Sequence, residues 1–499
     1  MMQSLRGALA ASIVFALLAS HDTQPAGAQP ASPSPSPSAG RAAIVTPATF
    51  GDPWTVDEIA GLAHDLDAQL AGAAALRGAH VGVLAVDTRT GAPLYARRAD
   101  DEFQPASTFK LVVGSAALDR LGEDQRFRTS AALTRSGALI VHGGGDALLT
   151  SADIDALAVA AVRAGVRRIR GPLVIDASRY DRSPYAPGWT WDDFTYDYAA
   201  KPSALALEKD VVHVHVAPGK VAGAPARWSV DPPVALVTSS VVTLPRGSAT
   251  TADVDPSPNG RLHLSGGIAL GSVPHSIDAA VADPQAYVAK AVVARLRAHG
   301  VDVRPIAVPR GFRIDQPQKT FWSRYSLPLS QMLPKFWIPS DNFIGEMLLK
   351  EIGYRSRGAP GTTAKGIAYE EHWLASFGID PSTLTLADGC GMSQYDRITP
   401  RDLVTILQHD WNGPYRAIVL DALPIGGARG TIEGISGTPA AGRVFAKTGS
   451  MMHVRGLAGY LATMHHGSVT FAFSVDDWNG DYASLAAVRA AVLSRIISD

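Results

Sequence analysis

The sequence predicts a multidomain α/β protein in which a mostly β region interrupts two stretches that mix helices with strands. Three observations support this fold class. Helical and strand patterns alternate from residue 43 to 128. Short alternating segments punctuated by glycine and proline follow over 129–322, which is typical of β structure. The last stretch, 323–499, returns to helices and strands. About 455 residues follow the N-terminal region, enough for two or more domains.

The N-terminal 42 residues are typical of a targeting segment and a linker. Arg6 precedes an apolar run from Gly7 to Ser20, which is short for a membrane span and fits the core of a signal peptide. We expect a signal peptide over 1–28 and a Pro/Ser-rich linker over 29–42. The sequence therefore predicts an exported protein, periplasmic or otherwise extracytoplasmic, with no membrane span in the mature chain. Whether the signal peptide is cleaved is left open.

The composition narrows the classes of partner. Charged residues make up 18% of the chain, the net charge is −1, and no basic stripe stands out, so nucleic acid is not expected as a partner. The single cysteine, Cys390, allows no internal disulfide. His213 and His215 alternate on one expected strand without a third partner at ligand spacing, so no metal site is expected.

The first part of the chain is expected to contain two helices and a strand pair. Apolar residues recur on one face over 57–75, which predicts an amphipathic helix. Residues 80–97 alternate like two strands joined by a turn. A nearly all-apolar helix over 105–118 follows, and it is expected to stop at Gly122, a common C-terminal cap.

The remaining elements follow from the same patterns. In the inserted region, strands are expected over 132–133, 138–141, 169–175, 211–216, 241–244 and 262–264, with helices over 154–164 and 284–299. In the last stretch, helices are expected over 341–352, 363–377, 399–410 and 483–497, with strands over 442–448, 457–463 and 469–475.

The segment Ser107-Thr-Phe-Lys110 opens the apolar helix and predicts a nucleophilic serine. Residues three apart share a helix face, so the Lys110 amine can reach the Ser107 hydroxyl. A serine becomes a good nucleophile when a neighbouring base takes its proton. Burial lowers the pKa of a lysine, which allows the neutral amine to act as that base.

Two further motifs stand in the last stretch, at places where acyl-transfer chemistry can use them. Ser340-Asp341-Asn342 begins an expected helix, and Lys447-Thr448-Gly449 ends an expected strand. Acyl transfer needs an oxyanion hole, for which the backbone N–H groups of Ser107 and Ser450 are the candidates. Gly449 has no side chain and would let a substrate strand approach the sheet edge closely.

The side chains of these motifs supply the remaining parts of such a site. Ser340 can pass a proton to the leaving nitrogen, and Asn342 can hold a substrate amide. Lys447 places a cation beside the cleft, which helps to keep Lys110 neutral. The same cation can pair with a substrate carboxylate, to which Thr448 adds a hydroxyl group.

The three motifs together resemble the signature of the serine DD-peptidase and β-lactamase superfamily. More narrowly, the chain resembles the class C low-molecular-mass penicillin-binding proteins, the D-alanyl-D-alanine carboxypeptidase/endopeptidase family. The long gap from Lys110 to Ser340 supports this match, because that family places extra domains there. The resemblance runs from about residue 50 to the C-terminus. Other stretches that resemble the family are 143–150, 186–193, 244–248, 388–393 and 446–460.

The resemblance implies a catalytic domain, made of 43–128 and 323–499, with helices on both faces of an antiparallel sheet and a helical lobe. It implies hydrolysis of D-Ala-D-Ala ends, and of D-Ala cross-links, in peptidoglycan stem peptides through an acyl-enzyme on Ser107. β-Lactam antibiotics would be covalent inhibitors, and no cofactor is expected. Asp193 would meet a cationic side chain of the stem peptide. The balance of carboxypeptidase and endopeptidase activity, the diamino acid of the stem peptide and the oligomeric state are left open.

Two residues depart from the family in the segment 388–394. Cys390 stands where serine is usual, and Gln394 stands where arginine is usual. Cys390 is expected to be a small packing residue, since free cysteine is among the most buried residue types. The alternative is a redox-sensitive residue in the groove. Gln394 could alter a contact with the substrate.

Three other functions are alternatives to D-Ala-D-Ala carboxypeptidase activity. Class A β-lactamases use a Glu-x-x-Leu-Asn motif for deacylation, and no asparagine in this chain follows a glutamate at that spacing. Slow hydrolysis of a penicilloyl adduct is therefore expected. A catalytically inactive wall-binding scaffold is disfavoured because all the motif residues are present. An esterase of the same superfamily stays open, since the same serine chemistry opens esters.

Overall fold

The structure is a computed structural model that describes residues 43–499 except 234–236, 258, 260, 304–316 and 433. The expected signal peptide (1–28) and linker (29–42) lie outside the described residues. Among the helices that are described, none is both long and apolar enough to cross a bilayer.

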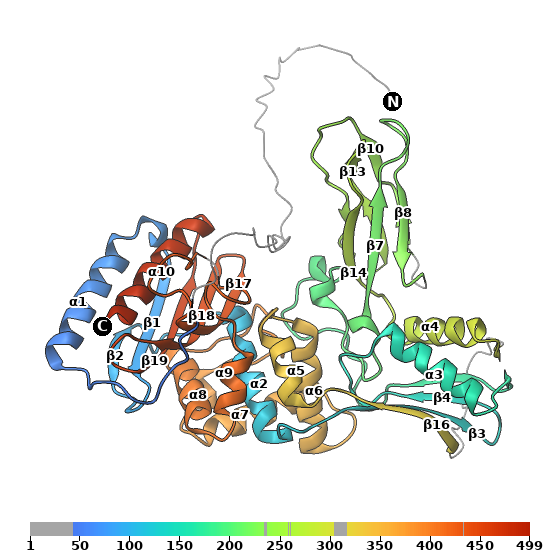
Figure 1. Cartoon of the computed structure of the whole chain (residues 1–499), viewed down its shortest axis with the longest axis horizontal. Helices are drawn as coiled ribbons and strands as arrows, with labels where there is room; N and C mark the ends of the chain where they lie inside the picture. Colours follow the sequence, from blue (N-terminus) through green and yellow to red (C-terminus); the bar gives the residue numbers. More distant parts are fainter. Residues whose placement is uncertain (1–42, 234–236, 258, 260, 304–316, 433) are drawn as a thin grey trace, which may run out of the picture. The chain divides into compact units, whose positions relative to one another are not determined.

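A five-stranded antiparallel sheet joins the two ends of the described chain (Figure 1). Its order is β17-β18-β19-β1-β2. The strands β1 and β19 pair although they come from opposite ends of the described chain: His80 lies opposite Asp476, and Asp87 lies opposite Val469. The strands are β1 (His80–Asp87), β2 (Pro93–Arg97), β17 (Val444–Met451), β18 (Val454–Ala462) and β19 (Ser468–Asp476). All five lie within a few residues of the predicted ranges.

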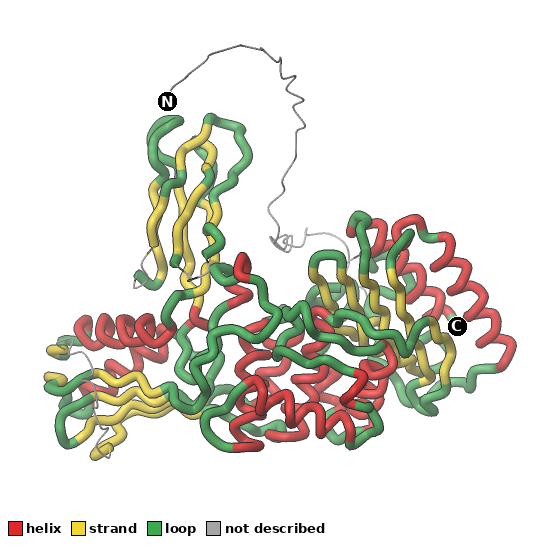
Figure 2. The backbone as a smooth tube through the Cα atoms, turned by 180° about the vertical axis from the view of Figure 1, so that it is seen from behind, coloured by secondary structure: helices red, strands yellow, loops and turns green. Residues whose placement is uncertain are grey.

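Helices cover both faces of this sheet (Figure 1, Figure 2). Along β1, Val83 and Ala85 pack into a core with α1 (Val56–Gly72) and α10 (Tyr482–Ser498). The intervening Leu84 packs into a second core, on the side of α8 (Pro400–Asn412). Successive side chains of a strand point to opposite faces, so a nearly unbroken apolar strand serves both cores. The α/β fold class with its flanked antiparallel sheet is confirmed.

The apolar segment that follows β2 differs in detail from the single helix expected. Ala106–Phe109 forms a 3₁₀ turn, η2, and α2 (Lys110–Leu121) continues from it. The helix stops at Gly122, as predicted, where φ is 83° and an L side chain would be strained.

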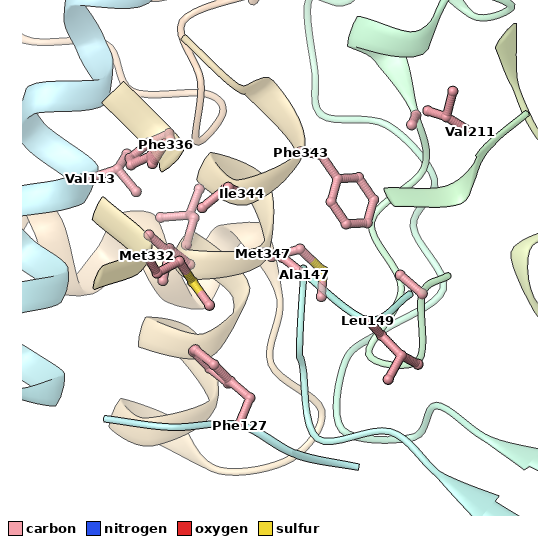
Figure 3. Close-up of a cluster of buried hydrophobic side chains, with 14 of the residues drawn as sticks. Val113, Phe127, Ala147, Leu149, Val211, Met332, Phe336, Phe343, Ile344 and Met347 are labelled. Carbon is pink, nitrogen blue, oxygen red and sulfur yellow. The ribbon is translucent and has the colours of Figure 1, made fainter. Parts of the chain in front are cut away.

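The other helices around α2 form the expected helical lobe. They are α5 (Leu329–Trp337), α6 (Asn342–Arg357), α7 (Thr363–Ala375), α8 and α9 (Arg416–Ala422). Neither α5 nor α9 was predicted. The helix α5 contains Pro334, which removes a backbone donor and is normally a helix-breaking signal. Figure 3 shows part of the core in which Met332 and Phe336 of α5 meet Val113 of α2.

The region between the two halves of the sheet forms sheets of its own, so the mostly β insert is present, together with two helices. The first sheet has the order β16-β3-β4-β6. Its strands are β3 (Arg128–Thr134), β4 (Leu139–His142), β6 (Leu173–Asp176) and β16 (Pro317–Tyr325). Beside it lie α3 (Ser151–Arg163), α4 (Pro284–Ala298) and the pair β5 (Arg168–Ile169) with β15 (Asp302–Val303).

The remaining strands of the insert are short. The order of one sheet is β14-β7-β8, that of another is β11-β12-β9, and β10 pairs with β13. The strands are β7 (Val211–Ala217), β8 (Arg227–Asp231), β9 (Val237–Ser239), β10 (Val242–Leu244), β11 (Asp253–Val254), β12 (Leu262–Ser265), β13 (Gly267–Ala269) and β14 (His275–Ala280).

One strand prediction in the insert was wrong. The single strand expected over 169–175 is two strands in different sheets, β5 and β6, separated by residues 170–172, which include Pro172. Proline cannot donate to a ladder, which explains the break. The strands β8, β9, β11, β13, β14, β15 and β16 were not predicted. Several of them, such as β14, β15 and β16, pair with strands that are distant in sequence.

Candidate active site

Ser107 lies in η2, at the turn that leads into α2, and its side chain is half-buried. The residue before it, Ala106, has φ 45°, a left-handed conformation that L residues seldom adopt. Two glycines make room for this turn. A Cβ on Gly391 would lie 1.9 Å from the Ala106 carbonyl oxygen, and one on Gly449 would lie 2.5 Å from that of Pro105. The conformation of the serine turn therefore depends on close backbone approaches from two other segments.

Lys110 begins α2 and is fully buried. Its Nζ lies 2.6 Å from the Ser107 Oγ, and it donates to the Asn342 Oδ1 and the Cys390 carbonyl, each at 2.7 Å. Burial lowers the pKa of Lys110, while the acidic side chains around it oppose that shift. The lysine is thus aimed at the serine, in surroundings that favour its neutral, basic form.

Lys447 on β17 is the second fully buried lysine of the site. Its Nζ donates to the Ser340 Oγ and to the Thr448 carbonyl, each at 2.8 Å. Burial lowers the pKa of Lys447 strongly, and the charge of Lys110 lowers it further. The effect runs from Lys110 onto Lys447, so the expectation that Lys447 helps to keep Lys110 neutral stays a prediction.

Ser340 and Asn342 flank the start of α6. Ser340 has φ 63°, a second left-handed non-glycine residue beside the chemistry. Asp341 between them caps the helix, because its Oδ1 accepts from the Ile344 N–H at 2.9 Å. The cap aligns the first turn of α6, so that Asn342 faces Lys110 and Ser340 faces Lys447.

The end of β17 reaches the serine turn. A Cβ on Gly449 would also lie 3.2 Å from the Ser107 N and 3.1 Å from the Thr108 N. The structure thus shows a serine turn against Gly449, where the sequence suggested room for a substrate strand. Ser450 follows on the same strand, opposite Arg455. Thr448 has its Oγ1 2.5 Å from that of Thr431.

Asp193 is connected to the cluster through a residue that the sequence analysis missed. The Asp193 Oδ1 accepts from the Tyr198 hydroxyl at 2.8 Å, and its Oδ2 accepts from the Thr190 hydroxyl at 2.5 Å. The Asn342 Nδ2 donates to the Tyr198 carbonyl at 2.9 Å. Because Asn342 and Tyr198 are 144 positions apart in the chain, no local motif could have indicated Tyr198.

Asp388 organises the loop on which Cys390 lies, and it was also missed. Its two oxygens accept five N–H groups, from the Trp189 side chain and the backbones of residues 390–393. Cys390 is fully buried, and burial raises the pKa of its thiol. The packing interpretation of Cys390 is therefore the one the structure supports. Glu346, Asp388 and Cys390 lie close enough to share a cation, but these N–H groups already occupy the Asp388 oxygens.

The other residues noted from the sequence have local partners. Gln394 accepts from the Gln104 side chain, with its Oε1 at 3.0 Å and its carbonyl at 2.9 Å. His213 pairs with Asp278 at 2.6 Å and His215 with Ser276 at 3.0 Å, so each histidine on β7 has a partner on β14.

The fold and the geometry define a class. The site has a serine that is hydrogen-bonded to a buried lysine, and it lies at the edge of an antiparallel sheet flanked by helices. This arrangement is typical of serine hydrolases that work through an acyl-enzyme. Residues 62–495 match the D-Ala-D-Ala carboxypeptidase 3 (S13) family, and the chain belongs to it. The predicted family and the predicted enzyme, a serine-type D-Ala-D-Ala carboxypeptidase, are confirmed.

Similar individual proteins support the same family assignment. The chain is 33% identical over 423 residues to a D-alanyl-D-alanine carboxypeptidase from an Actinomadura species, which covers 80% of this chain and 78% of that protein. It is 26% identical over 401 residues to the D-alanyl-D-alanine carboxypeptidase DacB of Haemophilus influenzae, covering 76% and 82% respectively. The crystal structure of penicillin binding protein 4 (dacB) from Haemophilus influenzae shares the fold, with a TM-score of 0.77 and 23% identity. That match covers 87% of this chain and 100% of the other.

Proposed function

We propose that Ser107 is the nucleophile and Lys110 the general base of this carboxypeptidase. In the proposed first step, the Ser107 Oγ attacks the carbonyl carbon of the peptide bond between two D-Ala residues, and its proton passes to Lys110. The 2.6 Å separation of the two groups and the burial of the lysine support these roles. The N–H groups of Ser107 and Ser450 would stabilise the oxyanion.

Departure of the terminal D-Ala needs a proton on its nitrogen. We assign this transfer to Ser340, whose hydroxyl accepts from Lys447 at 2.8 Å and can pass a proton on. Water then hydrolyses the acyl-enzyme and returns the Ser107 hydroxyl. Lys447 and Thr448 would bind the terminal carboxylate, and Asn342 would hold an amide of the substrate.

The substrate we propose is the stem peptide of peptidoglycan, with β-lactam antibiotics as covalent inhibitors at Ser107. Asp193 would receive a cationic group of the stem peptide, although both its oxygens now accept hydroxyl groups. An exported, extracytoplasmic protein fits this substrate. We also propose the domain division 43–128, 129–322 and 323–499, while noting that β16 (Pro317–Tyr325) runs through the last boundary.

A fluorescent penicillin and the purified mature protein test this function. Intact mass measured against time should show a stable adduct on the wild type and none on Ser107→Ala. D-Ala release from a stem-peptide analogue should fall with the same substitution. An adduct that vanishes within seconds would favour a β-lactamase, and no adduct would favour an esterase with a different pocket or an inactive scaffold.

A further inference from the structure

Three consecutive residues of the insert adopt a conformation that L residues avoid. Glu208, Lys209 and Asp210 have φ values of 50°, 56° and 57°, and none of them is glycine. A left-handed residue brings its Cβ close to the following carbonyl oxygen, so such residues normally occur singly. A run of three persists only where the surrounding contacts enforce it.

Those contacts are present on both sides of the turn. The Glu208 N–H donates to the Leu149 carbonyl at 2.9 Å, and the Glu208 Oε1 accepts from the Ser151 N–H at 2.7 Å. Asp210 is fully buried, and its Oδ1 accepts from the Leu207 N–H at 3.1 Å. The turn is thus held at the start of α3 and immediately before β7.

The same turn lies against the first turns of α6. Figure 3 shows Val211, which follows the turn, and Leu149, whose carbonyl accepts from the Glu208 N–H, in one hydrophobic cluster with Phe343 and Met347 of α6. Phe343 follows directly on Asn342, so this packing brings the insert to the catalytic motif.

The strained conformation directs Lys209 onto that motif. The Lys209 Nζ forms a hydrogen-bonded ion pair with the Asp341 Oδ2. The other carboxylate oxygen of Asp341 caps α6 through Ile344. The Asp341 side chain is only 10% exposed, so Lys209 is an integral partner of a nearly buried carboxylate.

We propose that Lys209, supplied by the insert, is a positioning residue of the active site. Through Asp341 it fixes the turn that presents Ser340 to Lys447 and Asn342 to Lys110. Small displacements of catalytic groups are costly because the reacting atoms must be close and aligned. The inference goes beyond the proposed function and rests on it, since it assumes that Ser340 and Asn342 act in acylation.

The ion pair also has an electrostatic consequence for the base. The charged and titratable groups around Lys110 come from three places: Asp341, which caps α6, and Glu346 within α6; Asp388 and Cys390 from the loop that follows α7; and Lys447 from β17. The charge of Asp341 acts to raise the pKa of Lys110. The cation of Lys209 offsets that charge, so its removal should raise the pKa of Lys110. Less neutral base is then present at low pH.

The test compares acylation by a fluorescent penicillin in full-length variants. Lys209→Met should slow acylation about tenfold and move the acidic limb of its pH–rate profile to higher pH. Lys209→Arg keeps the cation and should restore the rate to within about threefold of the wild type. Lys220→Met is the matched control, since Lys220 is exposed on the same insert and has no side-chain partner in the described part of the chain. It should acylate at the wild-type rate.

Two further variants separate positioning from folding. Lys209→Gly loses the same ion pair as Lys209→Met but suits a φ of 56°, so it should melt higher than Lys209→Met and yet acylate as slowly. In an Asp341→Asn background, Lys209→Met should cause no additional loss, because its partner is already neutral.

Wild-type acylation by Lys209→Met with an unshifted pH profile would overturn the inference. So would a full additional loss in the Asp341→Asn background, or a failure of arginine to restore the rate. A wild-type protein that forms no adduct at all would instead contradict the proposed function, so the two failures are distinguishable.

Discussion

The Nζ of Lys447 lies 2.8 Å from the Oγ of Ser340, and this hydrogen bond joins β17 to the turn before α6. The two residues are 107 positions apart in the chain. Ser340 accepts this bond from a left-handed conformation, with φ 63°. The site therefore combines a fully buried lysine with a backbone geometry that is costly for serine.

Replacement of Ser340 should separate activity from stability. Ser340→Ala and Ser340→Gly both remove the proposed proton relay, so penicillin acylation should fall by about 10²–10⁴-fold. Glycine tolerates φ 63° and alanine does not, so the glycine variant should be the more stable by about 1 kcal/mol. Acylation kinetics and urea unfolding measure the two effects. An alanine variant that acylates at the wild-type rate would remove Ser340 from the mechanism.

A charge at position 342 should change the pH dependence of acylation. Asn342→Asp places a carboxylate where the Oδ1 now accepts from Lys110 at 2.7 Å, which favours the ammonium form and raises the lysine pKa. Acylation needs the neutral amine, so the acidic limb of the pH–rate profile should move up by about one unit or more. Asn342→Ala adds no charge and should lower the rate without moving that limb so far. Stopped-flow acylation between pH 5 and 9 would show whether the limb moves.

The close packing of Gly449 should be intolerant of a methyl group. A Cβ there would lie 2.5 Å from the Pro105 carbonyl oxygen, a backbone atom that cannot move without shifting the Ser107 turn. We expect Gly449→Ala to lower both the melting temperature and the acylation rate. The control is Gly61→Ala, where a Cβ on α1 meets nothing within 4 Å and should stabilise by about 0.5–1 kcal/mol. Wild-type behaviour of Gly449→Ala would refute the importance of this contact.

The thiol of Cys390 should be inert in the folded protein. It is fully buried and its pKa is raised by burial, and both features suppress reaction with thiol reagents. A maleimide should label the protein once in denaturant and not in native buffer, as measured by intact mass. Cys390→Ser should acylate at close to the wild-type rate. Rapid native labelling that abolishes acylation would revive the redox-sensitive alternative.

Two buried carboxyl groups should make the protein less stable as the pH rises. Burial raises the pKa of Asp410 to about 7 and that of Glu346 to about 8. Between the ordinary carboxyl pKa near 4 and these values, the folded state binds more protons than the unfolded state, so the free energy of unfolding falls with rising pH. Each group contributes roughly 1–4 kcal/mol to this fall.

Urea unfolding at pH 5 and pH 8 checks this dependence. Asp410→Asn keeps an oxygen to accept from the Ser115 hydroxyl, which now donates at 2.7 Å, and it cannot ionise. The variant should therefore lose less stability than the wild type between the two pH values. An equal loss in both proteins would contradict the assignment to Asp410.

Local patterns were sufficient for much of this protein. Period-two and helical spacing predicted the five strands of the central sheet and most helices within a few residues, because those patterns reflect which side chains must face a core. The contact between Ser107 and Lys110 was predictable from their three-residue spacing, because it depends only on one helical turn. Strands whose partners are distant in sequence could not be predicted from such patterns. The helix α5 was missed because it contains Pro334, a residue that normally indicates the end of a helix.

The sequence by itself determined the residue types of the site, their order and the class of chemistry they can perform. Tertiary structure alone decided how they meet: Gly449 against Pro105, Lys447 against Ser340, and Lys209 of the insert against Asp341. It also decided the lowered pKa of Lys110, which comes from complete burial. Burial and contacts between distant segments depend on sheet register and helix packing, which no short stretch of sequence contains.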